Sequence, residues 1–194
     1  MNIKKENINE IKEKLILEGI KDIEKHGIQG LSLRRVATNC GVSCAAPYKH
    51  FKDKNQFISE IIKYINQQWY IRQELILKEC KDKNVRYKLT EISLEYIRFL
   101  IENSHFRSII MLKDKDIDPQ QARLKSELSF TTKELIKEYC QEVNMDEKSE
   151  RIKTFIVRSM IYGAALMFDN GELEQSEENF QLIAKSIERE FDLD

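Results

Sequence analysis

The stretch from Leu31 to Phe51, LSLRRVATNCGVSCAAPYKHF, constrains the fold of this chain more than any other part of its sequence. Ser32 can cap a helix at its N-terminus. The apolar positions that follow it at helical spacing are Leu33, Val36 and Ala37. Gly41 can then adopt the positive φ that reverses the chain, and Ser43 can cap a second helix. Two short helices joined by a tight turn predict a helix-turn-helix, whose second helix fits the major groove of duplex DNA.

Pro47 falls inside this expected second helix. If Ser43 is the N-cap, the proline removes one backbone donor at the end of the first turn, where the first intrahelical bond would form. We therefore expect a recognition helix that is short, tight or distorted.

Other residues around the turn recur in a recognisable order. They are Gly27, Ser32, Ala37, the turn Gly41–Val42–Ser43, the exit Tyr48–Lys49–His50–Phe51, and Lys54. In this order they resemble the DNA-binding region of the tetracycline-repressor (TetR) family of bacterial transcriptional regulators, over about residues 8–62. The chain departs from the family at Pro47, where a large aliphatic residue is commonest, and beyond residue 62 the similarity is one of architecture only.

The resemblance implies an all-α fold with two domains. Residues 1–53 are expected to form a three-helix helix-turn-helix domain, and residues 54–194 a helical ligand-binding and dimerisation domain. A family member of this kind is a ligand-responsive regulator, here expected to be a repressor that leaves its double-stranded operator when a small molecule binds. The resemblance also implies a homodimer, whose two heads reach major grooves about 34 Å apart.

Each expected DNA contact has a chemical reason. The planar guanidinium of Arg34 suits a guanine edge or a phosphate, whereas the helix after the turn offers mostly small side chains that meet thymine methyls. By resemblance Tyr48 and Lys54 hold phosphates, and His50 suits packing at the exit turn better than base reading. The expected DNA-binding residues are Ser32, Arg34, Ser43, Cys44, Ala45, Ala46, Tyr48, Lys49, His50 and Lys54.

The net charge of −1 hides an uneven distribution of charge along the chain. Residues 1–54 hold 11 Lys and Arg against 7 Asp and Glu, whereas the remaining residues hold 21 against 26. A basic head on an acidic body attracts the phosphate backbone at one end and repels it at the other, which orients the encounter with DNA.

Composition is that of an ordinary globular protein, with 34% charged and 41% hydrophobic residues. No apolar run approaches the roughly 20 residues that span a bilayer, so no membrane partner is expected. The start of the chain, Met1 to Glu6, is polar and charged rather than a signal peptide, and we expect the protein to stay in the cytoplasm.

The first helix is expected from about Ile8 to His26, with Asn7 and Glu10 at capping-box spacing and Gly27 ending it. Its inward-facing residues are expected to be Ile8, Ile11, Leu15, Ile16, Ile20 and Ile23.

A second capping-box pair, Asp53 and Gln56, starts a helix that is expected to run toward Cys80. Apolar periodicity predicts further helices around residues 89–99, 106–110, 124–139, 152–167 and 180–191. Breaks are expected at residues 81–84, 113–119, 144–146 and 169–172.

Aromatic and Met side chains in the middle helices could line a ligand cavity, with Arg98, His105 or Arg158 as polar anchors. The expected ligand-binding residues are Trp69, Tyr96, Arg98, Phe99, His105, Phe130, Phe155 and Met160. The alternative for the apolar residues is core packing, and for the two Arg residues a surface ion pair or a dimer contact.

Dimerisation is expected to use the last two long helices, because small residues there permit close backbone approach. The expected interface residues are Gly163, Ala164, Phe180, Ile183 and Ile187. Packing of the same residues within one chain is the alternative.

The four cysteines, Cys40, Cys44, Cys80 and Cys140, indicate no structural disulfide and are expected to be small buried residues. Cys44 is the exception, since a position at the exposed start of the recognition helix would lower its thiol pKa. A redox-sensing regulator that acts through Cys44 is therefore an alternative function.

No metal site, cofactor or catalytic residue is expected. Cys40, Cys44 and His50 are only three candidate ligands without a zinc spacing, and no nucleophile motif or phosphate loop is present. We expect no enzyme, and a carrier or enzyme with a vestigial DNA-binding head is the remaining alternative.

Overall fold

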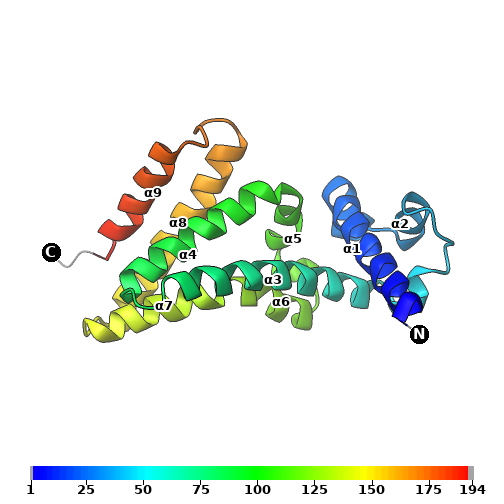
Figure 1. The fold of residues 1–194 in the computed structure, drawn as a ribbon, viewed down its shortest axis with the longest axis horizontal. Coiled ribbons are helices and arrows are strands. Elements are labelled where there is room, and N and C mark those ends of the chain that lie inside the picture. Colours follow the sequence, from blue (N-terminus) through cyan, green and yellow to red (C-terminus); the bar gives the residue numbers. More distant parts are fainter. Residues whose placement is uncertain (1, 192–194) are drawn as a thin grey trace. The chain divides into compact units, whose positions relative to one another are not determined.

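The computed structural model describes residues 2–191, with side chains from residue 9 onward. Within this range the chain forms helices and no strand, so the predicted all-α fold is confirmed (Figure 1). The chain packs as two compact units, one made of residues up to Gln67 together with His105–Ser126, and the other made of Gln68–Ser104 and residues from Glu127 onward.

The first unit begins with α1 (Asn2–Gly30). The predicted start at Ile8 is wrong, because the helix already runs from Asn2 and places the backbone of Asn7 inside it; the side chains of Asn7 and Ile8 lie outside those described. The predicted break is confirmed, since Gly27 interrupts the helix with φ 69°, a value that favours glycine.

After α1 come α2 (Leu33–Asn39), a 3₁₀ turn η1 (Pro47–Lys49) and the first part of α3 (Lys54–Glu79). The core between α1 and α3 consists of the buried side chains Leu15, Ile16, Ile20, Ile23, Phe51, Phe57, Ile58, Ile61, Ile62 and Ile65. The Phe51 and Phe57 rings meet edge to face at 4.6 Å, which anchors the exit of the turn on α3.

Two further segments belong to this unit. The turn η2 (Ser104–Phe106) leads into α5 (Arg107–Ile110), which packs on α1, and the turn η3 (Asp114–Asp116) precedes α6 (Pro119–Ser126). A capping box fixes the start of α6, because the Gln121 amide donates to Asp118 Oδ1 at 2.8 Å and the Asp118 amide donates to Gln121 Oε1 at 3.1 Å. The buried Gln121 side-chain amide also donates to the Asn55 carbonyl at 3.0 Å, which ties α6 to α3.

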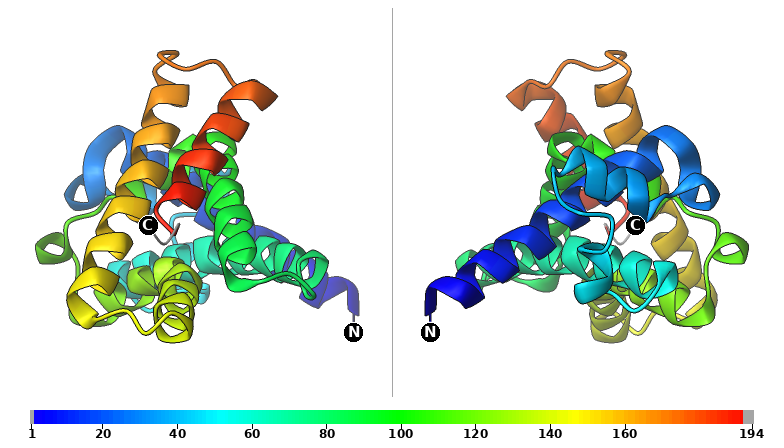
Figure 2. Two further views of the ribbon diagram at one scale, coloured as in Figure 1. Left: turned by 90° about the vertical axis from the view of Figure 1, so that its left-hand side faces the viewer. Right: turned by 90° about the vertical axis from the view of Figure 1, so that its right-hand side faces the viewer.

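The second unit is built around α4 (Val85–Glu102), which packs against α7, α8 and α9. Figures 1 and 2 show the four helices gathered in this way, with α8 and α9 antiparallel neighbours. Their bounds are α7 (Phe130–Glu142, after the turn η4 at Glu127–Ser129), α8 (Glu147–Asp169) and α9 (Glu177–Arg189).

Helix ends in the second unit follow the local sequence. Asn84, Asp146 and Ser176 are N-caps whose side chains accept from backbone amides three residues later, at 2.9, 2.8 and 3.3 Å. The chain turns with positive φ at Asn144 and Gly171. The predicted breaks at residues 81–84, 144–146 and 169–172 are thereby confirmed.

The compact units divide the chain differently from the expected boundary between residues 53 and 54. That boundary coincides with the start of α3, whereas the packing division falls within this helix, between Gln67 and Gln68. The first unit also takes in α5 and α6, since α5 packs on α1 and Gln121 of α6 bonds to the Asn55 carbonyl of α3.

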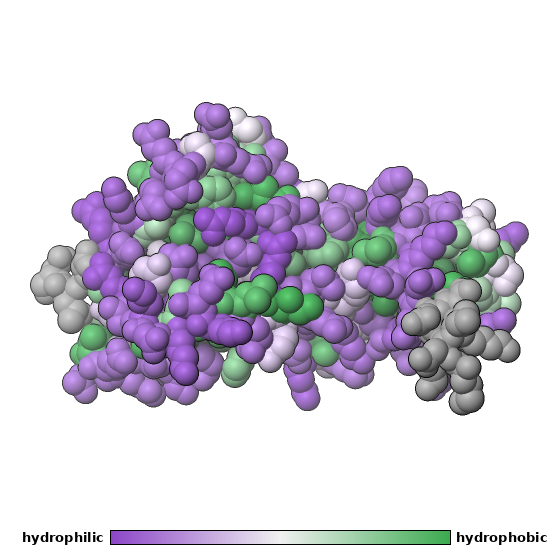
Figure 3. All heavy atoms as spheres, in the orientation of Figure 1, coloured by the Kyte–Doolittle hydropathy of each residue, from purple (hydrophilic) through white to green (hydrophobic). Residues whose placement is uncertain are grey.

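The surface is mostly hydrophilic in the view of Figure 3, with apolar side chains in small separate areas. In the described part of the chain, no helix has the length and apolar character needed to cross a membrane.

Candidate nucleic-acid interface

The helix α2 is fixed by its cap and by its buried face. The Ser32 hydroxyl accepts from the Arg35 amide at 3.4 Å, so the predicted cap is confirmed. Leu33, Val36 and Ala37 are buried, as the helical spacing predicts. The opposite face of α2 is therefore the one left for a partner.

A buried carboxylate that the sequence analysis did not identify holds α2 against α1. Asp22 accepts from the Ser32 amide at 3.0 Å, from Arg35 Nη2 at 2.8 Å and from Arg35 Nε. Arg35 Nη2 also donates to the Gly30 carbonyl at 2.8 Å. Burial raises the pKa of Asp22, but the hydrogen bonds from Arg35 and the Ser32 amide outweigh it, so the pKa lies below 3.8.

The two adjacent arginines are thus used differently. Arg35 is committed to Asp22 and to the end of α1. Arg34 is exposed on the outer face of α2, where its guanidinium can reach a nucleic acid. A helical step of about 100° per residue puts neighbours on different faces, which is why one pairs inward and the other projects outward.

The turn after α2 forms as predicted. Gly41 has φ 71°, and the Val42 amide donates to the Ala37 carbonyl at 3.0 Å, which closes the end of α2. Val42 is half-buried.

The expected second helix, however, is not an α-helix. Only the 3₁₀ turn η1 forms between Ser43 and His50, and Ser43 accepts from the Ala46 amide at 2.9 Å through its carbonyl instead of capping a helix. Pro47 has no amide to donate to the Ser43 carbonyl, so the first α-helical bond cannot form there. The expected distortion of the second helix is confirmed, and it is larger than expected because a 3₁₀ turn replaces the α-helix.

The turn η1 points its buried and exposed residues in opposite directions. Pro47 is buried, whereas Tyr48 is 61% exposed and Lys49 is exposed. Ser43, Cys44 and Ala45 lie in the exposed or partly exposed turn before it, and Ala46 is half-buried. Arg34, Tyr48 and Lys49 of the helix-turn-helix are therefore all accessible to a partner.

Two expected contacts have partners within the unit. Lys54 Nζ donates to the Gln29 carbonyl at 2.9 Å, which ties the start of α3 to the end of α1. His50 is half-buried, and burial together with Lys12 and Lys49 lowers its pKa below 6.5. These effects favour the neutral imidazole, which suits packing at the exit turn better than a contact to a phosphate.

The structure does not contain the helix N-terminus that was expected to make Cys44 reactive. Cys44 is exposed, but no α-helix starts at Ser43, so no helix dipole acts on its thiol. Cys40, Cys80 and Cys140 are buried, as expected of small apolar residues. Among the described residues no group of His, Cys, Asp and Glu side chains could hold a metal ion.

The residues expected to bind a ligand do not form one cluster. Trp69, Tyr96 and Phe99 are buried against one another, with ring centroids 4.7 to 6.1 Å apart, and Trp69 Nε1 donates to the Leu128 carbonyl at 3.1 Å. Arg98 lies over the Phe180 ring at 4.7 Å, and His105 belongs to the first compact unit. Packing and ring contacts account for all five positions, since the His105 ring meets the Phe106 ring at 4.5 Å.

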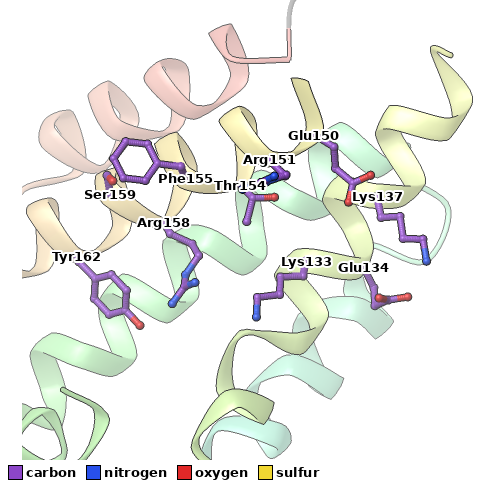
Figure 4. A pocket seen from close by; sticks show the side chains of 10 residues that line it. All are labelled: Lys133, Glu134, Lys137, Glu150, Arg151, Thr154, Phe155, Arg158, Ser159 and Tyr162. Atoms are coloured by element: carbon purple, nitrogen blue, oxygen red, sulfur yellow. The ribbon is translucent and has the colours of Figure 1, made fainter. Parts of the chain in front are cut away.

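The other three differ in exposure. Phe130 is 62% exposed, Met160 is half-buried, and Phe155 is 71% exposed at the edge of a groove between α7 and α8. The groove has a volume of about 880 Å³. Figure 4 shows its ten lining residues, which are Lys133, Glu134, Lys137, Glu150, Arg151, Thr154, Phe155, Arg158, Ser159 and Tyr162. The charged residues of α7 were not predicted, because aromatic periodicity carries no information about which charged side chains share a groove.

Most of the residues expected at a dimer interface pack within a single copy of the chain. Ala164, Ile183 and Ile187 are buried, and Phe180 stacks on Phe168 at 5.0 Å. Gly163 is half-buried, and a Cβ added there would meet nothing within 4 Å. Large apolar side chains are instead exposed on α8 and α9 at Ile152, Phe155, Leu166, Met167 and Leu182.

The chain resembles known proteins in its helix-turn-helix region and, more distantly, over most of its length. The model for bacterial regulatory proteins of the tetR family matches residues 16–61. YerO, an HTH-type transcriptional regulator of Bacillus subtilis, is 28% identical over 197 residues, which cover 96% of this chain. The chain spans 65% of the length of YerO.

Solved structures share the fold at lower identity. AibR, in complex with isovaleryl coenzyme A and operator DNA, superposes with a TM-score of 0.66 at 16% identity, over 92% of this chain and 96% of its own. FadR from Bacillus subtilis, in complex with stearoyl-CoA, gives 0.66 at 14% identity over the same shares. At these identities the likeness concerns the fold.

Proposed function

This chain belongs to the TetR family of bacterial regulatory proteins, and we propose that it is a repressor that binds operator DNA as a homodimer and releases it when a small molecule binds the second unit. The observation that supports DNA binding is that the two adjacent arginines of α2 have different surroundings. Arg35 is tied to Asp22, while Arg34 stands exposed on the same short helix-turn-helix as Tyr48 and Lys49. A basic outer face on a rigidly held helix is what a phosphate backbone recognises.

We propose Arg34, Tyr48 and Lys49 as the main DNA contacts, with Ser32 beside them. The turn from Ser43 to Ala46 provides small side chains that fit against the groove and methyl groups. Specificity then rests on few hydrogen bonds to bases and on the shape of the DNA. Lys54 and His50 serve chiefly to hold the exit turn, since Lys54 bonds to the Gln29 carbonyl and His50 is half-buried.

The experiment that tests this function is genomic footprinting of the binding sites, followed by binding assays on the recovered DNA. Arg34→Ala should weaken binding by about tenfold or more while leaving the thermal unfolding midpoint unchanged, because its side chain is exposed. Arg35→Ala is the matched comparison and should lower the unfolding midpoint. Binding that survives Arg34→Ala together with Lys49→Ala, on a sharply defined G/C-rich site, would contradict the proposal.

A homodimer is supported by the exposed apolar residues of α8. Ile152, Phe155 and Leu166 are exposed at spacings of three and eleven residues, which puts them on one side of the helix, and Gly163 leaves open space beside them. We propose that this stripe, with Leu182 of α9, packs against the same stripe of a second copy. Leu166→Glu should convert the dimer to a monomer in sedimentation experiments; a monomeric wild-type protein that binds its operator would defeat the proposal.

A small-molecule effector is supported by the groove between α7 and α8 and by the ligands of two structural relatives. AibR and FadR were crystallised with acyl-coenzyme A molecules, and both share the fold of this chain. We place the effector of this chain in the second unit, which holds the groove. Release of footprinted DNA by a candidate compound is the direct measurement.

A further inference from the structure

The groove between α7 and α8 has an unusual balance of charge. Its lining holds four cationic side chains, Lys133, Lys137, Arg151 and Arg158, against the two carboxylates Glu134 and Glu150. In Figure 4 the polar ends of Lys133, Arg158 and Tyr162 turn toward the same space between the helices, whereas Glu134, Lys137 and Glu150 gather at the other end. One end of the groove is therefore positive.

These four cations also lack the partners that other arginines of the unit have. Arg72 bonds to Glu95 at 3.0 Å and to Glu102 at 2.5 Å, and Arg98 lies 3.7 Å from Glu95. Across residues 9–191, by contrast, no carboxylate lies within 4 Å of the four groove cations. Neighbouring like charges without counter-charges raise the affinity of a site for an anion.

A buried hydroxyl lies close to this positive end. The Tyr96 hydroxyl is buried without a hydrogen-bond partner of regular geometry among the described residues, and the Tyr96 ring meets the Tyr162 ring at 6.4 Å. Burial first, and then nearby Tyr162, raise the pKa of Tyr96 well above 10, while Arg158 acts in the opposite direction. The Tyr96 hydroxyl, next to Tyr162 of the groove lining, therefore stays protonated and adds no negative charge at this end of the groove.

From these observations we infer that the α7–α8 groove binds an anionic organic molecule, with its carboxylate, sulfonate or phosphate held between Arg158 and Lys133 and its apolar part beside Tyr162. The volume of about 880 Å³ lies in the range typical of drug-sized ligands. The guanidinium fork of Arg158 suits a planar or tetrahedral oxyanion, and such charge-assisted bonds are the strong ones. This inference rests on the proposed function, because it names the chemical class of the effector.

The test uses two fluorescent probes that differ in one charge. The anilinonaphthalene sulfonate dye ANS and N-phenylnaphthylamine share the same aromatic skeleton, but only ANS carries an anionic group. The protein with Arg158→Gln and Lys133→Gln should bind ANS about tenfold more weakly than the wild type, because two charge-assisted hydrogen bonds are removed. Its affinity for N-phenylnaphthylamine should not change.

A matched control removes the same charge elsewhere in the second unit. Lys78 and Lys81 are exposed and do not line the groove, so the double variant Lys78→Gln, Lys81→Gln should keep both dye affinities. Equal loss of ANS binding in the two double variants, or equal loss of both dyes in the groove variant, would overturn the inference. So would a groove variant that dissociates the dimer in sedimentation without changing the preference for ANS, since the groove would then be an interface between copies.

A DNA assay separates this inference from the proposed function. Without dye, the groove variant should bind footprinted DNA as the wild type does, because its helix-turn-helix is unchanged. Saturating ANS should weaken DNA binding by the wild type and not by the variant. If DNA binding is normal and the dyes are not discriminated, only the inference about the ligand fails; if the wild type binds no DNA, the function fails whatever the dyes do.

Discussion

Gly19 illustrates how a single residue can set the spacing of two helices. A Cβ at this position would lie 2.5 Å from Phe57 Cζ and 2.6 Å from Phe57 Cε1, with Ile61 Cδ1 at 3.0 Å. The Phe57 ring is fully buried against Phe51, so it has no space into which to turn. The hydrogen atom of glycine lets α1 and α3 approach closely enough to exclude water from this core.

Replacing Gly19 by Ala should therefore lower the free energy of unfolding by about 1–3 kcal/mol, the usual cost of overpacking a core. Phe57→Leu removes ring atoms that the new methyl group would meet, so the double variant should be less destabilised than the sum of the two single variants. Urea unfolding of the three variants measures both quantities. Additive effects would mean that the methyl group does not press on Phe57.

Asp22 is a second residue whose environment has a measurable consequence. Its carboxylate joins the Ser32 amide and the Arg35 guanidinium, and its pKa lies below 3.8 for that reason. Because the folded pKa is lower than the unfolded value of about 3.9, the stabilisation is present above pH 4 and is lost as the pH falls through the folded pKa.

Asp22→Asn should cost about 1–3 kcal/mol of folding free energy at pH 7, because it leaves Arg35 without its counter-charge. The difference between wild type and variant should shrink below about pH 4, where the wild-type carboxyl takes up a proton. Denaturant unfolding between about pH 3 and pH 7 would measure it. A difference that stays constant over this range would show that the charge of Asp22 does not matter.

At the scale of elements, the segment after Gly41 is the one whose conformation departs most from expectation. The 3₁₀ turn at Pro47–Lys49 takes the place of an α-helix, with the His50 and Phe51 amides both donating to the Pro47 carbonyl at 2.9 Å. Proline accepts these bonds but cannot donate one backwards, so the element begins at Pro47 and not at Ser43.

Pro47→Ala restores an amide that can donate to the Ser43 carbonyl, and the segment from Ser43 to His50 should then become an α-helical turn. Hydrogen exchange of the new amide at position 47, followed by NMR, should be slowed by about tenfold or more relative to an open amide. Adding Lys49→Ala to this variant alters a side chain of the same segment but no backbone donor, and should leave the exchange pattern unchanged. Exchange of the new amide at the open rate would mean that the tertiary setting, not proline, imposes the 3₁₀ turn.

At the scale of the molecule, we expect the distribution of charge to govern the encounter with DNA. Residues 1–54 carry an excess of positive charge and the rest of the chain an excess of negative charge. Since binding to phosphates releases counterions, the logarithm of the binding constant should fall linearly with the logarithm of the salt concentration.

Lys49→Gln should reduce the steepness of that line by about 0.9, the value expected when one ammonium group no longer neutralises one phosphate. Lys185→Gln, on the exposed face of α9, removes the same charge far along the chain from the helix-turn-helix and should leave the slope unchanged. Binding isotherms at a series of salt concentrations give both slopes. Equal slopes for wild type and Lys49→Gln would remove Lys49 from the residues that bind phosphate.

Much of the fold was predictable because helix ends and buried helix faces depend on residues that are close together in the sequence. Caps such as Ser32 and Asp53, the positive φ of Gly27 and Gly41, and the apolar spacing of α1 are properties of a few adjacent residues. The start of α1 was misplaced because Asn7 and Glu10 resemble a capping box although the helix passes through them. Capping spacing shows where a helix can begin, and not where it must.

The sequence alone determined that the chain is all helical and that residues 31–51 hold a capped helix and a tight glycine turn, because these depend on hydrogen bonds and turns between near neighbours. Only the tertiary structure decided which arginine faces outward, that Asp22 is buried beside Ser32 and Arg35, and that the cations of α7 and α8 share one groove. Those facts arise from residues that are distant in sequence. Periodicity specifies the inward face of a helix, but the neighbour that the face meets depends on how all the helices pack together.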